Sequence, residues 1–227
     1  MTPEHVVPGV YRLPFDVGQA YVVEQPHGLV LIDTGAPGSG PAITGSLHAL
    51  GLAADDLVEI VITHSHDDHR GSLAELLART SAASIAHTAD APIIRGVQDQ
   101  VPPNLTAEER PFAEAVAGPV PPAPAAPVTR EAADGDAIGG GRVIHVPGHT
   151  PGSIAVLFPA LGVLFTGDTV ASVNGSPILG PFNIDRQLAR ASVKRLAAFD
   201  FEVACFGHGA PLIGGAAEAI RRLSEGW

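Results

Sequence analysis

Short apolar runs separated by Gly and Pro dominate the first part of the chain. Residues 6–13, 20–24 and 29–33 are β-prone and have turn residues between them, a pattern typical of short strands joined by tight connections. Residues 39–50 are then predicted to form a helix with proline in its first turn, where proline is tolerated. The apolar run at 57–62 predicts one more strand.

A Pro/Ala-rich stretch over residues 101–128 interrupts this pattern. Its segment 119–124 cannot form a regular helix, because proline lacks a backbone N–H and clashes with the preceding turn. Beyond it, strands are predicted from Arg142 onward, followed by helices at 186–199 and 214–223. Apolar residues recur at helical spacing in the last helix, so we expect it to cover a sheet.

Polar side chains cluster directly after the predicted strand at 57–62. Three histidines and two aspartates fall between residues 64 and 69, and a buried strand delivers its last residues to the edge of a sheet, where loops build sites. His64 and His66 point the same way on an extended segment, whereas Asp68 and His69 follow where the chain must turn. Imidazole and carboxylate groups are ligands of zinc and related divalent metals. This segment is therefore predicted to bind metal.

Later strand ends carry similar residues. His149 lies at the tip of a Pro/Gly turn, and Asp168 and His208 each follow an apolar run. Each is flanked by glycine, which lets the backbone turn tightly and approach an ion without a Cβ in the way. These residues are candidates for the remaining ligands.

At these positions the sequence resembles the metallo-β-lactamase fold superfamily, specifically its glyoxalase II-like hydrolases. The resemblance rests on the His-x-His-x-Asp-His motif and on the order of the later residues, and it covers nearly the whole chain. It implies an α/β fold, the αββα sandwich of the metallo-β-lactamase type, in which two mixed β-sheets are flanked by helices. A faint internal echo agrees with two similar halves, because residues 28–34 and 162–169 both contain Gly, an apolar strand, Asp and Thr.

The resemblance also implies a role for each candidate. His64, His66 and His149 would bind a first metal, Asp68, His69 and His208 a second, and Asp168 would bridge both. Asp33 matches the family's buried aspartate beneath the site and would orient a ligand histidine. The expected cofactors are two divalent metal ions, with zinc preferred and iron or manganese as alternatives.

These ligands predict a dinuclear metal-dependent hydrolase. Two metals about 3.5–4 Å apart can share a water and lower its pKa toward neutrality. The hydroxide held between them would attack a small ester-like, thioester or lactone substrate. Asp68 is the catalytic candidate, because it can also accept a hydrogen bond from the nucleophilic water.

Other interpretations stay open. A mononuclear non-haem iron enzyme resembling the persulfide dioxygenases would use His64, His149 and Asp168, since two histidines and one carboxylate also bind iron. A β-lactamase and a non-catalytic metal-binding module are the remaining alternatives.

Length and charge limit the possible partners. The chain has 227 residues, of which 45% are hydrophobic, and its formal net charge is −11. Because the candidate ligands span residues 64–208, we expect one domain over 1–227, with an insertion or lid near 101–128. The small number of Lys and Arg residues, without a cluster, disfavours nucleic acid. Without an apolar leader or a membrane-length apolar segment, a cytoplasmic protein that does not contact membranes is expected.

A small molecule is the expected substrate. Glyoxalase II proper has a further C-terminal helical region for glutathione, which is not expected in a sequence ending at Trp227, and neither Tyr11 nor Tyr21 matches the tyrosine of related lactonases. Residues 171–185 and 101–128 are predicted to line the pocket. Both are apolar and lack Lys clusters, so the substrate should be neutral or weakly anionic and partly apolar. The stretch 101–128 is alternatively a surface excursion or a contact in a homo-oligomer.

Overall fold

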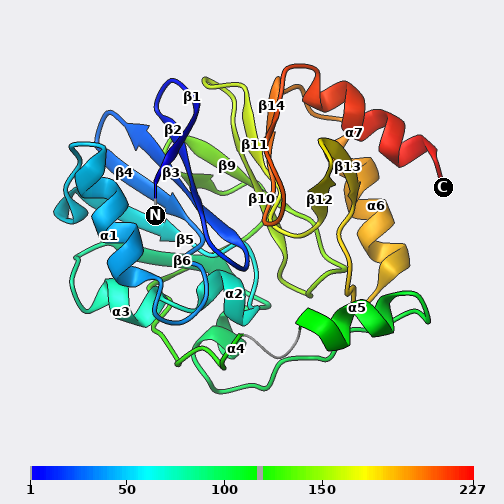
Figure 1. Cartoon of the computed structure of the whole chain (residues 1–227), viewed down its shortest axis with the longest axis horizontal. Coiled ribbons are helices and arrows are strands. Elements are labelled where there is room, and N and C mark those ends of the chain that lie inside the picture. The colour runs from blue at the N-terminus through cyan, green and yellow to red at the C-terminus, as the bar shows by residue number, and fades with distance from the viewer. Residues whose placement is uncertain (1, 117–119) are drawn as a thin grey trace. The chain divides into compact units, whose positions relative to one another are not determined.

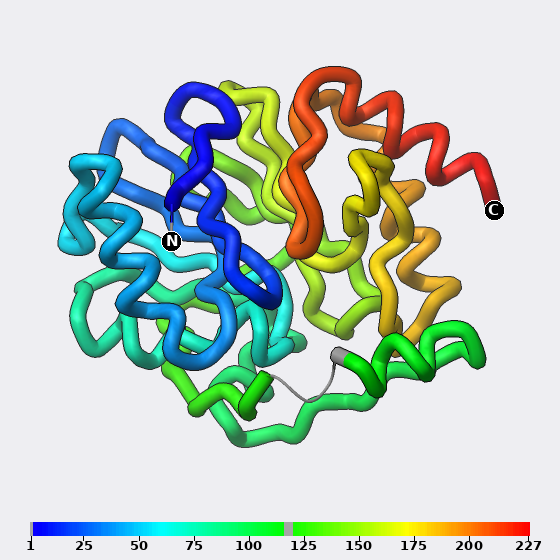
Figure 2. The backbone as a smooth tube through the Cα atoms, viewed as in Figure 1, coloured from blue at the N-terminus to red at the C-terminus, as the bar shows by residue number. Residues whose placement is uncertain are grey.

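The computed structural model describes residues 2–116 and 120–227. The chain forms two compact units that alternate along the sequence: Met1–Asp99 with Val120–Ala132, and Gln100–Pro119 with Ala133–Trp227. The trace in Figure 2 follows the chain as it leaves the first unit, returns to it and then completes the second. That these units form a single domain stays a prediction.

The first unit contains a mixed seven-stranded sheet whose strands lie in sequence order. Its strands are β1 (Glu4–Val7), β2 (Val10–Pro14), β3 (Gln19–Gln25), β4 (Gly28–Ile32), β5 (Leu57–Val61), β6 (Ala83–His87) and β7 (Arg130–Ala132). Strands β1 to β4 pair antiparallel, whereas β4 to β7 pair parallel. Parallel neighbours need long crossover connections. These contain α1 (Gly40–Ala49), the 3₁₀ turn η1 (Ala54–Asp56), α2 (Asp67–Arg70), α3 (Leu73–Leu77) and α4 (Ala91–Ile94).

The core of the first unit is aliphatic. Leu31 and Ile60 of the sheet belong to one buried cluster with Ile43 and Leu47 of α1 and Leu73 of α3. The two α1 residues are four apart, so they lie on one face of the helix, and Figure 1 shows α1 and α3 beside each other next to the sheet. The predicted helix at 39–50 and strand at 57–62 are confirmed, with proline in the first turn of α1.

The second unit contains a six-stranded mixed sheet in the order β15-β14-β11-β10-β9-β8 and a separate hairpin, β12-β13. Its strands are β8 (Ala137–Ile138), β9 (Gly141–His145), β10 (Ile154–Phe158), β11 (Val163–Phe165), β12 (Val170–Val173), β13 (Ser176–Leu179), β14 (Val203–Cys205) and β15 (Leu212–Ile213). Within the large sheet, β11 and β14 pair parallel and the other pairs are antiparallel. Its helices are α5 (Glu109–Val116), α6 (Arg186–Leu196) and α7 (Ala216–Glu225).

Helices α6 and α7 pack together in this unit (Figure 1). Val193 of α6 and Ile220 of α7 are fully buried in one cluster with Leu164 of β11. Asp185 caps α6 by accepting a hydrogen bond from the backbone N–H of Leu188 at 2.9 Å. The predicted helices at 186–199 and 214–223 are confirmed, with ends shifted by a few residues. In the described ranges, no helix has the length and apolar character needed to cross a membrane.

The Pro/Ala-rich stretch contains one element that the sequence analysis missed, helix α5. Residues 120–124 are not helical, as predicted, while Pro119 lies outside the described residues. Ala126 and Val128 are buried in the core of the first unit, and the backbone N–H of Ala126 donates to the carbonyl of Ile94 at 2.9 Å. The end of the stretch is therefore part of a packed core.

Candidate metal centre

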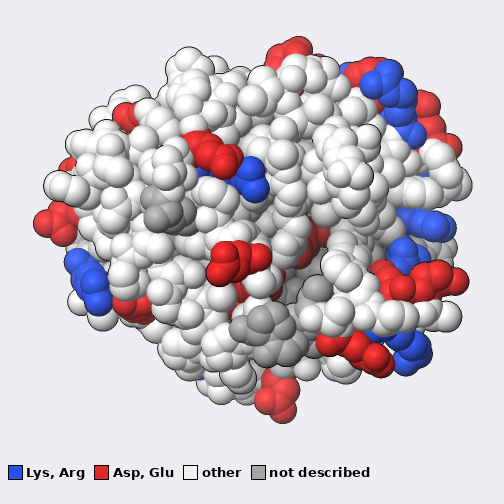
Figure 3. Space-filling model, in the orientation of Figure 1, with Lys and Arg blue, Asp and Glu red and all other residues white. Residues whose placement is uncertain are grey.

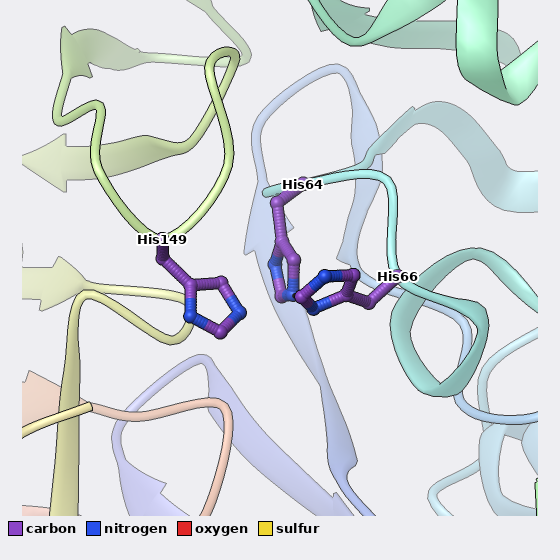
Figure 4. A group of neighbouring side chains, drawn as sticks. All are labelled: His64, His66 and His149. Carbon is purple, nitrogen blue, oxygen red and sulfur yellow. The ribbon is translucent and has the colours of Figure 1, made fainter. Parts of the chain in front are cut away.

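His64 and His66 lie on the loop that follows β5. Parallel strands flank β5 on both sides. Its carboxyl end therefore lies at the edge of the sheet where loops form binding sites. Nε2 of His64 lies 3.1 Å from Nδ1 of His66, and Figure 4 shows the two rings turned toward each other. Two nitrogens bound about 2.0–2.1 Å from a tetrahedral ion lie about 3.3 Å apart. The pair therefore has the spacing of two ligands of one metal.

Asp33 lies buried beside this loop, directly after β4. Its Oδ1 accepts the backbone N–H of Thr63 at 2.7 Å, and its Oδ2 accepts the Thr63 hydroxyl at 2.7 Å. The same Oδ2 lies 2.8 Å from Nδ1 of His69. Because an ionised carboxylate only accepts, the His69 proton is held at Nδ1, which leaves the lone pair of Nε2 available to a metal.

Helix α2 brings Asp68 next to His69. Nε2 of His69 lies 3.5 Å from Oδ2 of Asp68, and the His69 side chain is fully buried, whereas that of Asp68 is 18% exposed. The two residues that the family resemblance assigns to a second metal are therefore neighbours. Their donor atoms face each other, and only the carboxylate reaches solvent.

Two buried charged residues, Arg70 and Asp90, hold the loop after β5 at Ser65. The sequence analysis missed both. Arg70 is buried; its Nε donates to the carbonyl of Ser65 at 2.8 Å and its guanidinium binds Asp67 at 2.9 Å. The fully buried Asp90 accepts the backbone N–H of Ser65 at 2.8 Å. Arg70 could have been noticed in the sequence, because it directly follows the 64–69 segment. No local signal marked Asp90, which is distant in sequence.

In the second unit, two histidines approach one carboxylate oxygen. Oδ2 of Asp168 lies 3.6 Å from Nε2 of His149 and 3.2 Å from Nε2 of His208. Asp168 follows β11 and His208 follows β14, and these strands are parallel neighbours, so their carboxyl ends meet at one edge of the sheet. His149 lies on the turn between β9 and β10 (Figure 4). A carboxylate oxygen near two imidazole nitrogens suits a residue shared by two ions.

A backbone carbonyl orients the ring of His149. Nδ1 lies 3.1 Å from the carbonyl oxygen of Pro181. Since a carbonyl only accepts, Nδ1 carries the proton and Nε2 is the nitrogen that faces Asp168. The turn itself is tightly packed: at Gly148, where φ is 130°, a Cβ would lie 2.2 Å from the backbone nitrogen of Ala189 in α6. Only glycine fits this close approach.

The donor set in each unit fits a divalent metal. The first unit presents His64, His66, Asp68 and His69, and the second presents His149, Asp168 and His208. The only cysteine, Cys205, lies buried in β14. Imidazole nitrogens and carboxylate oxygens without a thiolate suit zinc, iron(II) and manganese. Which residues share an ion stays a prediction.

Comparison with known proteins identifies the family. The profile of the metallo-beta-lactamase superfamily matches residues 13–208. The probable metallo-hydrolase YflN of Bacillus subtilis (strain 168) is 27% identical, covering 91% of this chain and 86% of that protein. A hydroxyacylglutathione hydrolase of Cereibacter sphaeroides is 30% identical over 76% of this chain, but over 54% of its own length. The chain thus spans about half the length of this second relative.

Solved structures share the fold. A Cronobacter sakazakii metallo-beta-lactamase with a HARLDQ motif has a TM-score of 0.74 at 24% identity, covering 98% of this chain and 91% of that chain. TTHA1623, solved in a di-iron-bound form, has a TM-score of 0.67 at 29% identity, covering 89% and 92%. Together with two mixed sheets and their helices, these matches confirm the predicted fold class. The chain therefore belongs to the metallo-β-lactamase superfamily, whose members are mostly metal-dependent hydrolases.

Proposed function

We propose that this chain is a dinuclear metal-dependent hydrolase that acts on a small thioester, lactone or other ester-like substrate. The observation that carries the proposal is the convergence of donor atoms within each unit. Two imidazole nitrogens lie 3.1 Å apart after β5, and one oxygen of Asp168 lies 3.2 Å and 3.6 Å from two more. Membership of the superfamily and the di-iron-bound relative support the same chemistry.

In this proposal, each candidate ligand binds one of two ions or is shared by both. His64, His66 and His149 hold one ion, Asp68, His69 and His208 hold the other, and Asp168 is shared. When bound, such ions lower the pKa of a water toward neutrality and polarise the oxygen of an acyl group.

The protein's own contribution is orientation. Asp33 keeps the His69 proton on Nδ1, and the carbonyl of Pro181 does the same for His149. Both imidazoles therefore present Nε2 as a donor. The partly exposed carboxylate of Asp68 accepts a hydrogen bond from the attacking water and directs its lone pair at the substrate carbonyl.

Relatives and surface charge support the proposed substrate class. Hydroxyacylglutathione, after which one relative is named, is an acyl thioester. The net charge of −11 and the paucity of basic residues support a neutral or weakly anionic small molecule. On the face drawn in Figure 3, Lys and Arg are interspersed with Asp and Glu; on α7, for example, Arg222 pairs with Glu218 at 3.4 Å. Such a surface does not favour a polyanion such as nucleic acid.

Elemental analysis and a substrate panel test the proposal together. The metal-loaded protein should contain about two divalent ions per chain and hydrolyse at least one class among thioesters, lactones and esters. Chelation should abolish turnover and metal addition should restore it. A single iron per chain with persulfide-dependent oxygen consumption would instead establish the mononuclear alternative. Metal binding without turnover on any class, β-lactams included, would favour a non-catalytic module.

The variant His208→Ala tests the ligand assignment. His208 is the one proposed second-metal ligand outside the 64–69 segment, so its loss should remove that ion selectively while the other stays. His48→Ala, at an exposed position on α1, is the matched control and should keep both ions. Full metal content and full activity in His208→Ala would contradict the assignment.

A further inference from the structure

Helix α5 begins with a reciprocal pair of hydrogen bonds. The hydroxyl of Thr106 accepts the backbone N–H of Glu109 at 3.2 Å, and Oε2 of Glu109 accepts the backbone N–H of Thr106 at 2.9 Å. This is the capping box that Thr-x-x-Glu sequences form at helix starts. The box uses only one carboxylate oxygen of Glu109. The other oxygen, Oε1, points to a different segment.

Oε1 of Glu109 binds the loop that precedes α6. It accepts the backbone N–H of Phe182 at 3.2 Å and forms an ion pair with Arg186. Further along α5, the ring of Phe112 stacks on that of Phe182, with centroids 5.4 Å apart and an interplanar angle of 27°. A carboxylate and an aromatic contact therefore fasten α5 to residues 182–186.

The same loop supports two predicted metal ligands. The carbonyl of Pro181 holds Nδ1 of His149 at 3.1 Å. At Gly180 the backbone passes so close to Asp168 that a Cβ would lie 1.7 Å from its carbonyl oxygen, and the Gly180 N–H donates to the carbonyl of Thr169 at 3.2 Å. A shift of the turn 180–182 would thus disturb the acceptor of His149 and the backbone support of Asp168 together.

This turn holds a bulky residue in a disfavoured backbone conformation. Phe182 has a φ of 61°, in the left-handed region that bulky residues disfavour. Such a conformation persists only where its surroundings fix it. Two of the contacts at Phe182 come from α5, where Glu109 binds its N–H and Phe112 packs on its ring. The side-chain amide of Asn183 also spans the turn by donating to the carbonyl of Gly180 at 2.7 Å, but the contacts from α5 act on Phe182 itself.

We infer that Glu109 is a positioning residue of the hydrolytic site, because by fixing the turn 180–182 it sets the orientation of His149. The inference rests on the proposed function, in which His149 is a metal ligand. Glu109 does not reach the reacting atoms; it acts through the N–H of Phe182 and the carbonyl of Pro181. The competing explanation is that its carboxylate only caps α5.

Three variants separate capping from positioning. In Glu109→Gln, the amide oxygen can still accept from Thr106, since glutamine also forms capping boxes. A neutral amide with a single oxygen cannot at the same time accept the N–H of Phe182 and form an ion pair with Arg186. Thr106→Ala removes the capping hydroxyl but leaves the contacts of Oε1. Glu108→Gln, at the exposed neighbouring position, controls for the change of charge.

The tautomer of the His149 ring is the deciding measurement. In the full chain after metal removal, long-range ¹H–¹⁵N NMR, assigned with His149→Gln, should show the Nδ1–H tautomer in the unaltered protein, Thr106→Ala and Glu108→Gln. Glu109→Gln should show a mixture of tautomers. Zinc affinity from chelator competition should fall about tenfold in Glu109→Gln alone, the lower end of the range for groups that orient ligands.

The outcomes distinguish this inference from the proposed function. If Glu109→Gln keeps the tautomer and the zinc affinity and loses only thermal stability, Glu109 is a helix cap and the inference is overturned. If the unaltered protein binds no metal, the proposed function fails. The tautomer of His149 in Glu109→Gln still decides the role of Glu109 in that case.

Discussion

At the scale of single residues, two of the candidate ligand histidines, His69 and His149, are held by groups that fix one nitrogen of the ring. Asp33 binds Nδ1 of His69, and the carbonyl of Pro181 binds Nδ1 of His149. One acceptor is a charged side chain and the other is a neutral backbone group, but both leave Nε2 as the donor to a metal. The negative charge of Asp33 would also attract the positive charge of a bound metal ion.

Asp168→Asn should keep the shape of its site but lose the shared charge. Because Oδ2 of Asp168 lies near both His149 and His208, we expect the affinity for both ions to fall together, by about 10–100-fold or more. Chelator competition and elemental analysis measure this. Asp200→Asn, whose side chain is fully exposed in the same unit, should change neither. Normal affinity for both ions in Asp168→Asn would rule out a bridging role.

Asp33→Asn should weaken the binding of the ion held by His69. Asparagine tolerates the left-handed φ of 60° at this position, so the backbone is not the cause of the effect. The NH₂ group of asparagine would face N–H or O–H groups that now donate hydrogen bonds to the carboxylate. The lost hydrogen bonds should lower the free energy of unfolding by about 1–3 kcal/mol. Denaturant melts and metal titration measure the two effects, with the exposed Asp55→Asn as control. Unchanged melts and titrations would contradict the role given to Asp33.

At the scale of elements, each unit places an aspartate after a strand that has a parallel neighbour. Asp33 follows β4, which pairs with β5, and Asp168 follows β11, which pairs with β14. In each unit, histidines follow the parallel partner strand, namely His64 after β5 and His208 after β14. The echo between 28–34 and 162–169 in the sequence therefore corresponds to equivalent positions in two sheets.

Gly148→Ala should separate the turn of His149 from α6. A Cβ would lie 2.2 Å from the backbone of Ala189, and the φ of 130° is unsuited to alanine. We expect a loss of about 1–3 kcal/mol of unfolding free energy together with weaker metal binding. Gly45→Ala on α1, where a Cβ meets nothing within 4 Å, should instead be neutral or stabilising by up to about 1 kcal/mol. Equal melts for the two variants would contradict the close packing of this turn.

The contacts of Glu109 that hold α5 against residues 182–186 should be lost in acid. Burial alone raises the pKa of Glu109, but hydrogen bonds from Thr106, Arg186 and Phe182 and the charge of Arg186 hold that pKa below its ordinary value of 4.5. A lowered pKa in the folded state means that the stabilisation is present above pH 4.5 and is lost as the pH falls through the folded pKa. Thermal melts should therefore differ between the unaltered protein and Glu109→Gln near neutrality, and this difference should shrink below pH 4.5. A difference that persists unchanged in acid would contradict this prediction, and Glu108→Gln should show no such trend.

At the scale of the whole molecule, the predicted ligands are divided between the two units. His64, His66, Asp68 and His69 belong to the first, and His149, Asp168 and His208 belong to the second. A metal that binds the folded chain and not the unfolded chain stabilises the fold by mass action. The acidic composition, with a net charge of −11, adds a further reason for cations to stabilise the folded state.

Metal removal should lower the melting temperature. With free metal at 100 times its dissociation constant, binding contributes about 2.7 kcal/mol per site, which calorimetry with and without a chelator measures. A chelator already saturated with zinc is the control and should have no effect. An unchanged melting temperature after confirmed metal removal would show that the ions do not stabilise the fold.

The sequence by itself indicated the candidate ligands, and through its resemblance to a known family it also indicated the fold class. The reason is that strands, helices and the 64–69 segment that carries the resemblance are encoded by consecutive residues, whose spacing is visible along the chain. The glycine-flanked His149, Asp168 and His208 were visible for the same reason. The Thr106-x-x-Glu109 box was also legible, but the surrounding proline-rich composition hid α5.

Only the tertiary structure decided how the candidate ligands are held. The carbonyl of Pro181 carries no sequence signature, because every residue has such a group. Glu109 and Arg186 are 77 residues apart, and Asp33 and His69 are 36 apart. Pairs this distant meet only when strands and helices pack. The chain thus encodes its donors locally, whereas their tautomers and orientations depend on contacts that form on folding.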